Sequence, residues 1–173
     1  GSLAEASDFI EYSGTGVHPQ RQQGPHSHAI NVSPDNRFAF VADLGLDKIF
    51  IYRFDAEKGK LTPNSPSFVT LPPGAGPRQF TFHPNGKFLY VVNEIQSTVT
   101  TFTYSAGSLK EVQNISTLPQ GFNGANTAAT LQVHPNGRFL YASNRGADDI
   151  AVYSIDPQAG TLTLVESVPA QGR

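Results

Sequence analysis

The sequence predicts an all-β fold, and three observations lead to this prediction. Aromatic and β-branched residues gather in short runs such as QFTF, FLYVVN and TVTTFTY, which are typical of strands. Tight turns of the form HPNGK and HPNGR separate such runs, because proline fixes φ and Asn-Gly tolerates positive φ. No segment carries a sustained apolar stripe with helical spacing, so an α/β fold is disfavoured.

One unit occurs three times along the 173 residues. Its copies begin at His28, Arg78 and Ala129. The turn prolines of the copies are 50 and 51 residues apart: Pro34, Pro84 and Pro135. Three further anchors keep this spacing: Phe40, Tyr90 and Tyr141; Asp43, Asn93 and Asn144; Tyr52, Phe102 and Tyr153. Four anchors at one period indicate a true internal repeat.

Each copy supplies four strands in chain order. The first strand precedes the proline turn and the second follows it. The third strand is KIFIYRF, TVTTFTY or IAVYSI, and the fourth lies within GKLTPNSPSFVTL, GSLKEVQNISTL or GTLTLVESV. Four antiparallel strands in about 50 residues fit one blade of a β-propeller.

We therefore expect about three complete blades, over residues 28–77, 78–128 and 129–173. Residues 3–27 are expected to hold the outer strand of a preceding blade and a lead-in, and residues 1–2 are typical of a cloning scar. A blade buries both of its faces only against neighbouring blades. The chain is therefore expected to be an interior piece of a longer propeller, with two open blade faces that invite self-association.

Composition excludes several classes of function. A net charge of -2 gives no indication of a nucleic-acid partner or of binding to an anionic membrane. No run of 18 apolar residues predicts a membrane-spanning helix. Cysteine is absent, which excludes disulfides and thiolate chemistry. No signal peptide follows the first residues, and we expect a cytoplasmic location.

Two polar positions break the repeat. Six residues before the turn proline the copies carry different residues: His28, Arg78 and Ala129. Ten residues after it they also differ: Leu44, Glu94 and Arg145. The two ends of an antiparallel hairpin meet opposite its turn, so these positions are expected to share one rim of the propeller. An arginine-rich rim with one carboxylate and one imidazole suits a small anionic substrate.

Structural explanations compete with this functional one. An ion pair between blades, from Glu94 to either arginine, would account for the same residues. His26 and His28, with His18 nearby, suggest a metal site, but no carboxylate follows at a supportive spacing, and no metal is expected. His83 and His134 share one repeat position, where packing or hydrogen bonding at the turn is the expected role.

Three stretches carry a resemblance to a known family: HSHAINVSPDNRFAFVADLGLDKI, GAGPRQFTFHPNGKFLYVVNE and HPNGRFLYASNRGADDIAVYSID. They resemble the seven-bladed β-propeller lactonases, which include bacterial 6-phosphogluconolactonases of the propeller type and fungal carboxy-muconate lactonizing enzymes. The resemblance covers the chain from about residue 17 onward. It implies about three blades from the middle of a seven-bladed parent.

The resemblance implies hydrolysis of a small anionic sugar lactone without a metal or another cofactor. Motif by motif, it implies catalytic roles for His28 and Glu94 and substrate binding by Arg78 and Arg145. In this hypothesis the arginines hold a phosphate or carboxylate. Glu94 or His28 activates water, and the other assists the leaving ring oxygen.

Three alternatives remain open at this point. A lactonizing enzyme would use similar groups in the reverse direction. A non-enzymatic propeller that binds a protein or ligand would share the repeat, although a pure scaffold has little reason to vary the residues at its rim. The piece by itself is also expected to be inactive if the missing blades complete the site.

Overall fold

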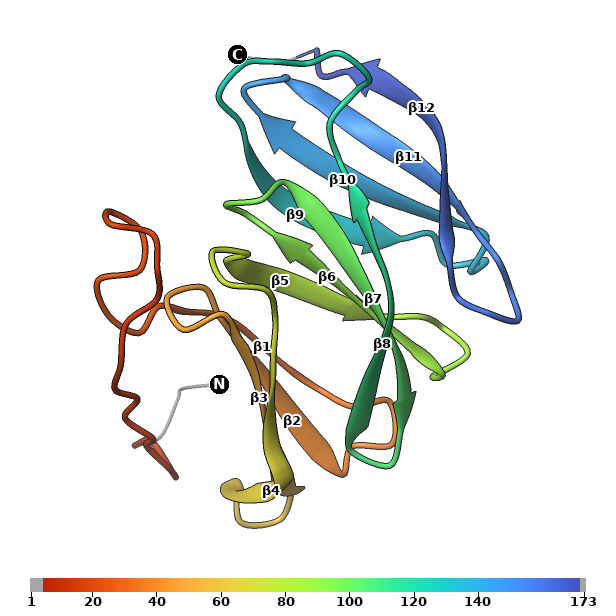
Figure 1. Cartoon of the computed structure of the whole chain (residues 1–173). Coiled ribbons are helices and arrows are strands. Elements are labelled where there is room, and N and C mark those ends of the chain that lie inside the picture. Colours follow the sequence, from red (N-terminus) through yellow and green to blue (C-terminus); the bar gives the residue numbers. More distant parts are fainter. Residues whose placement is uncertain (1–4, 172–173) are drawn as a thin grey trace.

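Each strand pairs with its neighbour in sequence. The computed structural model describes residues 5–171, in which three four-stranded antiparallel sheets follow one another along the chain (Figure 1). Blade 1 contains β1 (Ser27–Val32), β2 (Phe38–Asp43), β3 (Lys48–Asp55) and β4 (Lys60–Thr70). Blade 2 contains β5 (Pro77–Phe82), β6 (Phe88–Asn93), β7 (Thr98–Ser105) and β8 (Ser108–Ser116). Blade 3 contains β9 (Thr127–Val133), β10 (Phe139–Arg145), β11 (Asp149–Ile155) and β12 (Leu162–Pro169). The predicted all-β fold of four-stranded blades is confirmed.

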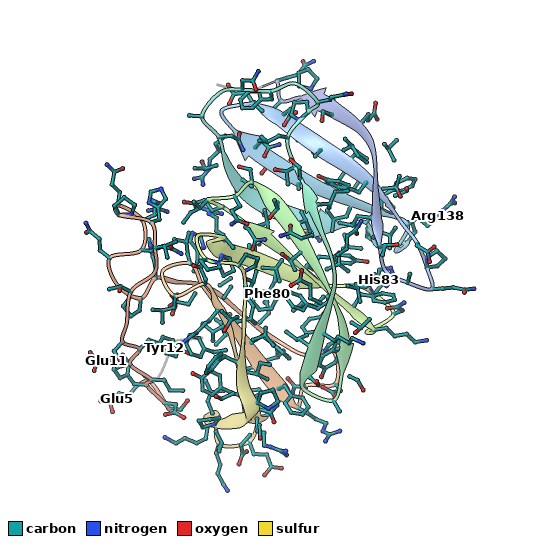
Figure 2. The ribbon with its side chains drawn as sticks, in the orientation of Figure 1. Glu5, Glu11, Tyr12, Phe80, His83 and Arg138 are labelled. Carbon is teal, nitrogen blue, oxygen red and sulfur yellow. The ribbon has the colours of Figure 1, made fainter. Side chains whose placement is uncertain are left out.

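The first hairpin of each blade closes at its predicted proline turn. In blade 2, the His83 amide donates to the carbonyl of Phe88 at 2.9 Å, and Gly86 adopts a φ of 70°. The His83 ring also accepts the Asn85 amide at 3.1 Å and contacts the carbonyl of Gly137, in the turn of blade 3, at 2.8 Å. Figure 2 shows His83 between the two blades. His83 therefore joins neighbouring turns by hydrogen bonds, as its repeat position suggested.

The core lies between the blades, and β6 contributes to it on both sides. Phe88 and Tyr90 pack in the cluster shared with blade 3, whereas Leu89 and Val91 pack in the cluster shared with blade 1. All six residues of β6 are buried. Because each large apolar side chain buried in this way contributes roughly 1.5–3 kcal/mol, the blades are held together by their faces.

Residues 5–26 form no strand. The segment pairs with none of the described strands, and its side chains lie against blade 1. The Tyr12 ring stacks on Phe50 with 4.2 Å between centroids, and its hydroxyl lies 2.6 Å from that of Tyr52. The Asp8 carboxylate accepts the amide of Leu61 at 2.9 Å. The outer strand expected within residues 3–27 is therefore not seen in residues 5–26. The cloning scar expected at residues 1–2 lies outside the described residues.

Blade 3 has a face that no other part of residues 5–171 covers. We call it the outer face of blade 3, and it consists of Phe139, Tyr141, Ile150, Val152, Val165, Glu166 and Val168. The repeat equivalents in blade 2 of three of these residues are buried by blade 3: Phe88, Tyr90 and Val99. On the outer face itself, Ile150 is 37% exposed and Val168 is 42% exposed. Residues 5–171 contain no helix that is long and apolar enough to cross a bilayer.

Candidate active site

His28 and Arg78 occupy the same kind of backbone position. In β1, the residues on either side of His28 pair with consecutive residues of β2, so His28 is one extra residue. In β5, Arg78 is extra relative to β6 in the same way. β9 carries a similar irregularity over Ala129 and Thr130, opposite β10. Such β-bulges re-aim a side chain and are common next to active sites. The bulges explain why these positions differ chemically while the strands around them repeat.

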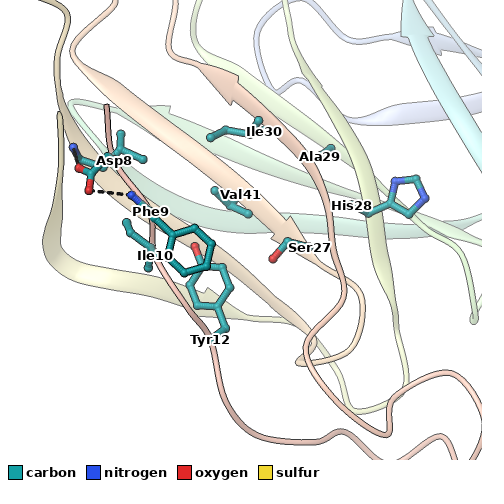
Figure 3. A pocket seen from close by; sticks show the side chains of 10 residues that line it. Asp8, Phe9, Ile10, Tyr12, Ser27, His28, Ala29, Ile30 and Val41 are labelled. Atoms are coloured by element: carbon teal, nitrogen blue, oxygen red, sulfur yellow. Dashed lines mark hydrogen bonds between the residues drawn. The ribbon is translucent and has the colours of Figure 1, made fainter. Parts of the chain in front are cut away.

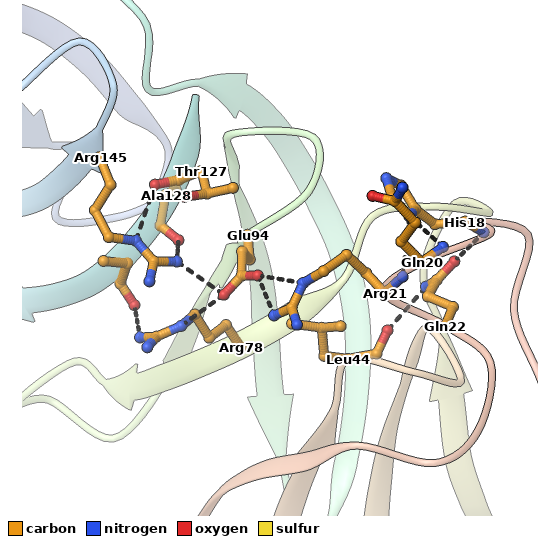
Figure 4. A network of polar contacts seen from close by, with 11 residues as sticks. His18, Gln20, Arg21, Gln22, Leu44, Arg78, Glu94, Thr127, Ala128 and Arg145 are labelled. Atoms are coloured by element: carbon orange, nitrogen blue, oxygen red, sulfur yellow. Dashed lines mark hydrogen bonds and ion pairs between the residues drawn. The ribbon is translucent and has the colours of Figure 1, made fainter. Parts of the chain in front are cut away.

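Glu94 directly follows β6 and is the centre of a polar network (Figure 4). Its side chain is only 3% exposed. Arg21 donates to Oε1 through Nε, at 3.1 Å, and through Nη2. Oε2 accepts Nε of Arg78 at 2.9 Å and Nη2 of Arg145 at 2.9 Å. A carboxylate offers about four acceptor positions, so this one is fully occupied.

The charge of Glu94 follows from these contacts. Burial raises the pKa of its carboxyl, but hydrogen bonds from Arg21 and Arg145 and their positive charges lower it by more. The pKa of Glu94 therefore lies below its ordinary value, and the group is ionised at neutral pH. Three guanidinium groups surround one carboxylate, which leaves the cluster positively charged. A carboxylate so occupied is unavailable as a metal ligand.

The three arginines differ in exposure. The Arg78 side chain is 19% exposed, and its Nη1 donates to the carbonyl of Ala129 on β9. Arg145 is 50% exposed and donates from Nε to the carbonyl of Thr127 at 3.4 Å. Arg21 is 40% exposed. Within residues 5–171, Nη1 of Arg21, Nη1 of Arg145 and Nη2 of Arg78 make no hydrogen bond. These groups are available to bind an anion from solvent.

His28 lies on β1, next to the strand β5 that carries Arg78, and its side chain is largely exposed. Partial desolvation lowers its pKa, and the positive charge of Arg78 lowers it further, whereas Glu94 has a smaller opposite effect. The pKa of His28 therefore lies below its ordinary value of 6.5, and the ring is neutral at pH 7. A neutral imidazole near an arginine cluster is able to accept a proton.

A pocket of about 340 Å³ lies on the other side of His28, between the N-terminal segment and β1 (Figure 3). Its lining is mostly apolar and includes Phe9, Ile10, Tyr12 and Val41. The one charged group among the lining residues, Asp8, is an acid. This pocket does not suit an anionic ligand, whereas the Glu94 cluster does.

The repeat comparison found three members of the network. Arg78, Glu94 and Arg145 are brought together as expected, and the proposed ion pair between blades is also present, from Arg145 to Glu94. Arg21 was missed because it lies outside the aligned copies, in a loop, HPQRQQG, whose counterparts ahead of blades 2 and 3, LPPGAG and LPQGFNG, carry glycine at its position and lead into their blades over different lengths. The available signal was an arginine in a loop bounded by Gly16 and Gly24, directly ahead of blade 1.

Comparison with known proteins identifies the family. Residues 1–173 match a family described as "Lactonase, 7-bladed beta-propeller". The chain belongs to this family of propeller lactonases. The predicted resemblance is thereby confirmed, and the family is one of seven-bladed propellers.

Named relatives are similar to this member of the family along nearly its whole chain. It is 37% identical to the 6-phosphogluconolactonase of Bacillus subtilis, over 99% of this chain and 48% of that protein. The solved periplasmic gluconolactonase of Pseudomonas aeruginosa is 36% identical, with a TM-score of 0.87 over 93% of this chain and 46% of that one. A putative 6-phosphogluconolactonase from Bacteroides fragilis is 34% identical, with a TM-score of 0.85 over 93% and 46%. The chain thus spans about half the length of these relatives.

Proposed function

We propose that the polypeptide to which these residues belong hydrolyses a small anionic sugar lactone. One observation carries the proposal: three arginines converge on buried Glu94 and form a positively charged cluster, next to the strand that carries His28. The names of the relatives support the choice of lactone, since they include a 6-phosphogluconolactonase and a gluconolactonase. No metal or other cofactor enters the proposal.

The arginines would bind the anionic group of the substrate. Guanidinium groups bind phosphate and carboxylate in a bidentate manner, and Arg145 has an unused Nη1 on its exposed side. Arg78 is the more buried of the two arginines that the repeat comparison selected. Its unused Nη2 would donate to the carbonyl oxygen as that atom gains negative charge.

His28 is assigned the role of general base. All acceptor positions of Glu94 are taken by arginines, so Glu94 is unable to accept a proton from water without losing one of them. His28 would take a proton from water while the water oxygen bonds to the lactone carbonyl carbon. The ring C–O bond then breaks, and protonated His28 returns the proton to the departing ring oxygen. The sum is the addition of one water across the ester bond.

Hydrolysis assays test this function directly. Opening of a lactone releases an acid, so a pH-stat follows the rate after subtraction of spontaneous hydrolysis. The substrates are 6-phosphoglucono-δ-lactone and glucono-δ-lactone, and carboxy-muconolactone tests the related lactonizing reaction. Both the 173-residue chain and the complete polypeptide that contains it are assayed, with solution mass measured in the same fractions. A complete polypeptide that never exceeds the spontaneous rate contradicts the proposal. The cytoplasmic location remains a prediction.

A further inference from the structure

The third arginine of the network is carried by a short loop with its own internal order. The Gly16 amide donates to the carbonyl of Gln22 at 2.9 Å, and the Gln22 amide donates to that of His18 at 3.0 Å. Nδ1 of the His18 ring accepts the amides of Gln20 at 3.3 Å and Arg21 at 3.1 Å. These bonds fix the backbone from which the Arg21 side chain extends toward Glu94 (Figure 4).

Gln22 anchors this loop in the protein. It is 1% exposed, and both donors and the oxygen of its side-chain amide form hydrogen bonds. Oε1 accepts the His18 amide at 2.9 Å, while Nε2 donates to the carbonyl of Leu44 and to Oδ1 of Asp47, both at 2.8 Å. Gly16 packs directly on this amide, since a Cβ at that position would lie 2.6 Å from the Gln22 Oε1. A buried polar group satisfied in this way holds its neighbours in one arrangement.

A chain of hydrogen bonds links this anchor to the strand that ends at Glu94. Oδ1 of Asp47 also accepts the Gly76 amide at 2.8 Å. The Gly76 carbonyl in turn accepts the amide of Glu94 at 2.8 Å. Gln22 and Glu94 are therefore positioned against each other through Asp47 and Gly76. Arg21, the residue next to Gln22, meets the carboxylate of Glu94 as a consequence.

We infer that Arg21 is a third anion-binding residue of the site and that Gln22 and Asp47 are positioning residues that hold it there. The inference rests on the proposed function. Arg21 reaches Oε1 of Glu94, whereas Arg78 and Arg145 reach Oε2, so the carboxylate lies between guanidinium groups (Figure 4). The unused Nη1 and the 40% exposure of Arg21 leave it free to contact a phosphate or a carboxylate on its side of Glu94.

Binding of defined anions to the complete polypeptide tests the inference without relying on turnover. The probes are 6-phosphogluconate, which carries a phosphate and a carboxylate, and gluconate, which carries a carboxylate alone. Arg21→Gln is expected to weaken 6-phosphogluconate binding about tenfold, as loss of a charge-assisted hydrogen bond does. An equal loss for gluconate assigns Arg21 to the carboxylate, and an unchanged gluconate affinity assigns it to the phosphate. Arg138→Gln, at an exposed turn, is the matched control.

The positioning role needs a separate readout. Gln22→Glu places a carboxylate beside Asp47 and is expected to raise KM for 6-phosphoglucono-δ-lactone about as much as Arg21→Gln, with kcat within about twofold. A positioning role raises KM for the charged lactone and leaves the KM of neutral glucono-δ-lactone close to that of the wild type. A general loss of structure would lower kcat for charged and neutral lactones alike, and that result would overturn the positioning role.

Failure of the proposed function and failure of the inference about Arg21 give different results. A wild-type protein that neither hydrolyses the lactones nor binds either probe overturns the proposed function and, with it, this inference. A wild-type protein that binds 6-phosphogluconate overturns only this inference if Arg21→Gln binds both probes as well as Arg138→Gln does.

Discussion

Arg78 and Glu94 lie 16 residues apart in the chain and meet at 2.9 Å across the open end of the β5–β6 hairpin. The same carboxylate oxygen accepts Arg145 from the next blade at 2.9 Å. One buried atom therefore joins two blades at the rim. The site, the packing around it and the outer face of blade 3 lead to five predictions.

Glu94→Gln is expected to disorganise the arginines rather than to remove a base. An amide has one acceptor oxygen, and its NH₂ group would face guanidinium donors. We expect KM for the anionic lactone to rise at least about tenfold and the free energy of unfolding to fall by about 2 kcal/mol. Steady-state kinetics and urea unfolding measure both. If KM is unchanged and only kcat falls, Glu94 is acting as a base.

The charge of Arg78 is expected to control the titration of His28. Burial and Arg78 lower the pKa of His28 below 6.5, so activity that needs the neutral ring falls only at pH values under 6.5. Arg78→Gln removes the positive charge and is expected to raise this pKa, moving the acidic limb to higher pH. NMR titration of the imidazole, assigned by comparison with His28→Gln, provides the measurement. If the pKa of His28 is the same in Arg78→Gln as in Arg138→Gln, the charge of Arg78 does not control it.

Acid is expected to weaken the protein through Glu94. The folded-state pKa of this carboxyl is lowered from its ordinary 4.5, so its stabilisation is complete above pH 4.5. The stabilisation is lost as the pH falls through the lowered value. The stability difference between wild type and Glu94→Gln should therefore be smaller at about pH 3 than at neutral pH. Glu57→Gln, at an exposed position, serves as the control. A difference that does not depend on pH would contradict the prediction.

Gly76 is expected to tolerate no side chain. Its φ is 68°, and a Cβ would lie 2.7 Å from Cγ1 of Ile95. Gly121 has a similar φ of 81° with nothing within 4 Å, so Gly121→Ala measures the backbone strain alone. We expect Gly76→Ala to destabilise the protein by about 1–3 kcal/mol more than Gly121→Ala, because of overpacking. Equal melting temperatures for the two variants would show that the Ile95 side chain moves aside with little loss of stability.

We propose that the 173-residue chain self-associates through the outer face of blade 3. The matching face of blade 2 is buried by another blade, whereas Val168 on the outer face is 42% exposed. Light scattering is expected to show a mass that rises with concentration, and Val168→Lys should lower it. Val112→Lys, at an exposed position of β8, should have no such effect. A wild-type chain that stays monomeric at all concentrations contradicts this proposal.

Repetition made the fold and three rim residues predictable. Strand order and turns followed from anchors that recur in all three copies, and unequal residues at equal positions revealed Arg78, Glu94 and Arg145. Arg21 was beyond this comparison because it lies outside the aligned copies, in a lead-in loop of variable length. The full occupancy of Glu94 was also out of reach, because it depends on how three segments converge in space. Sequence alone therefore left the choice of base open between Glu94 and His28.

The β-bulges suggest how such a rim changes over generations. His28 and Arg78 are extra residues in their strands, outside the alternation that fills the core. A substitution at either position changes none of the apolar residues that pack between the blades. Blades with the same packing therefore carry histidine, arginine or alanine at the irregular position of the first strand. Different residues thus determine the chemistry of the rim and the apolar packing between the blades.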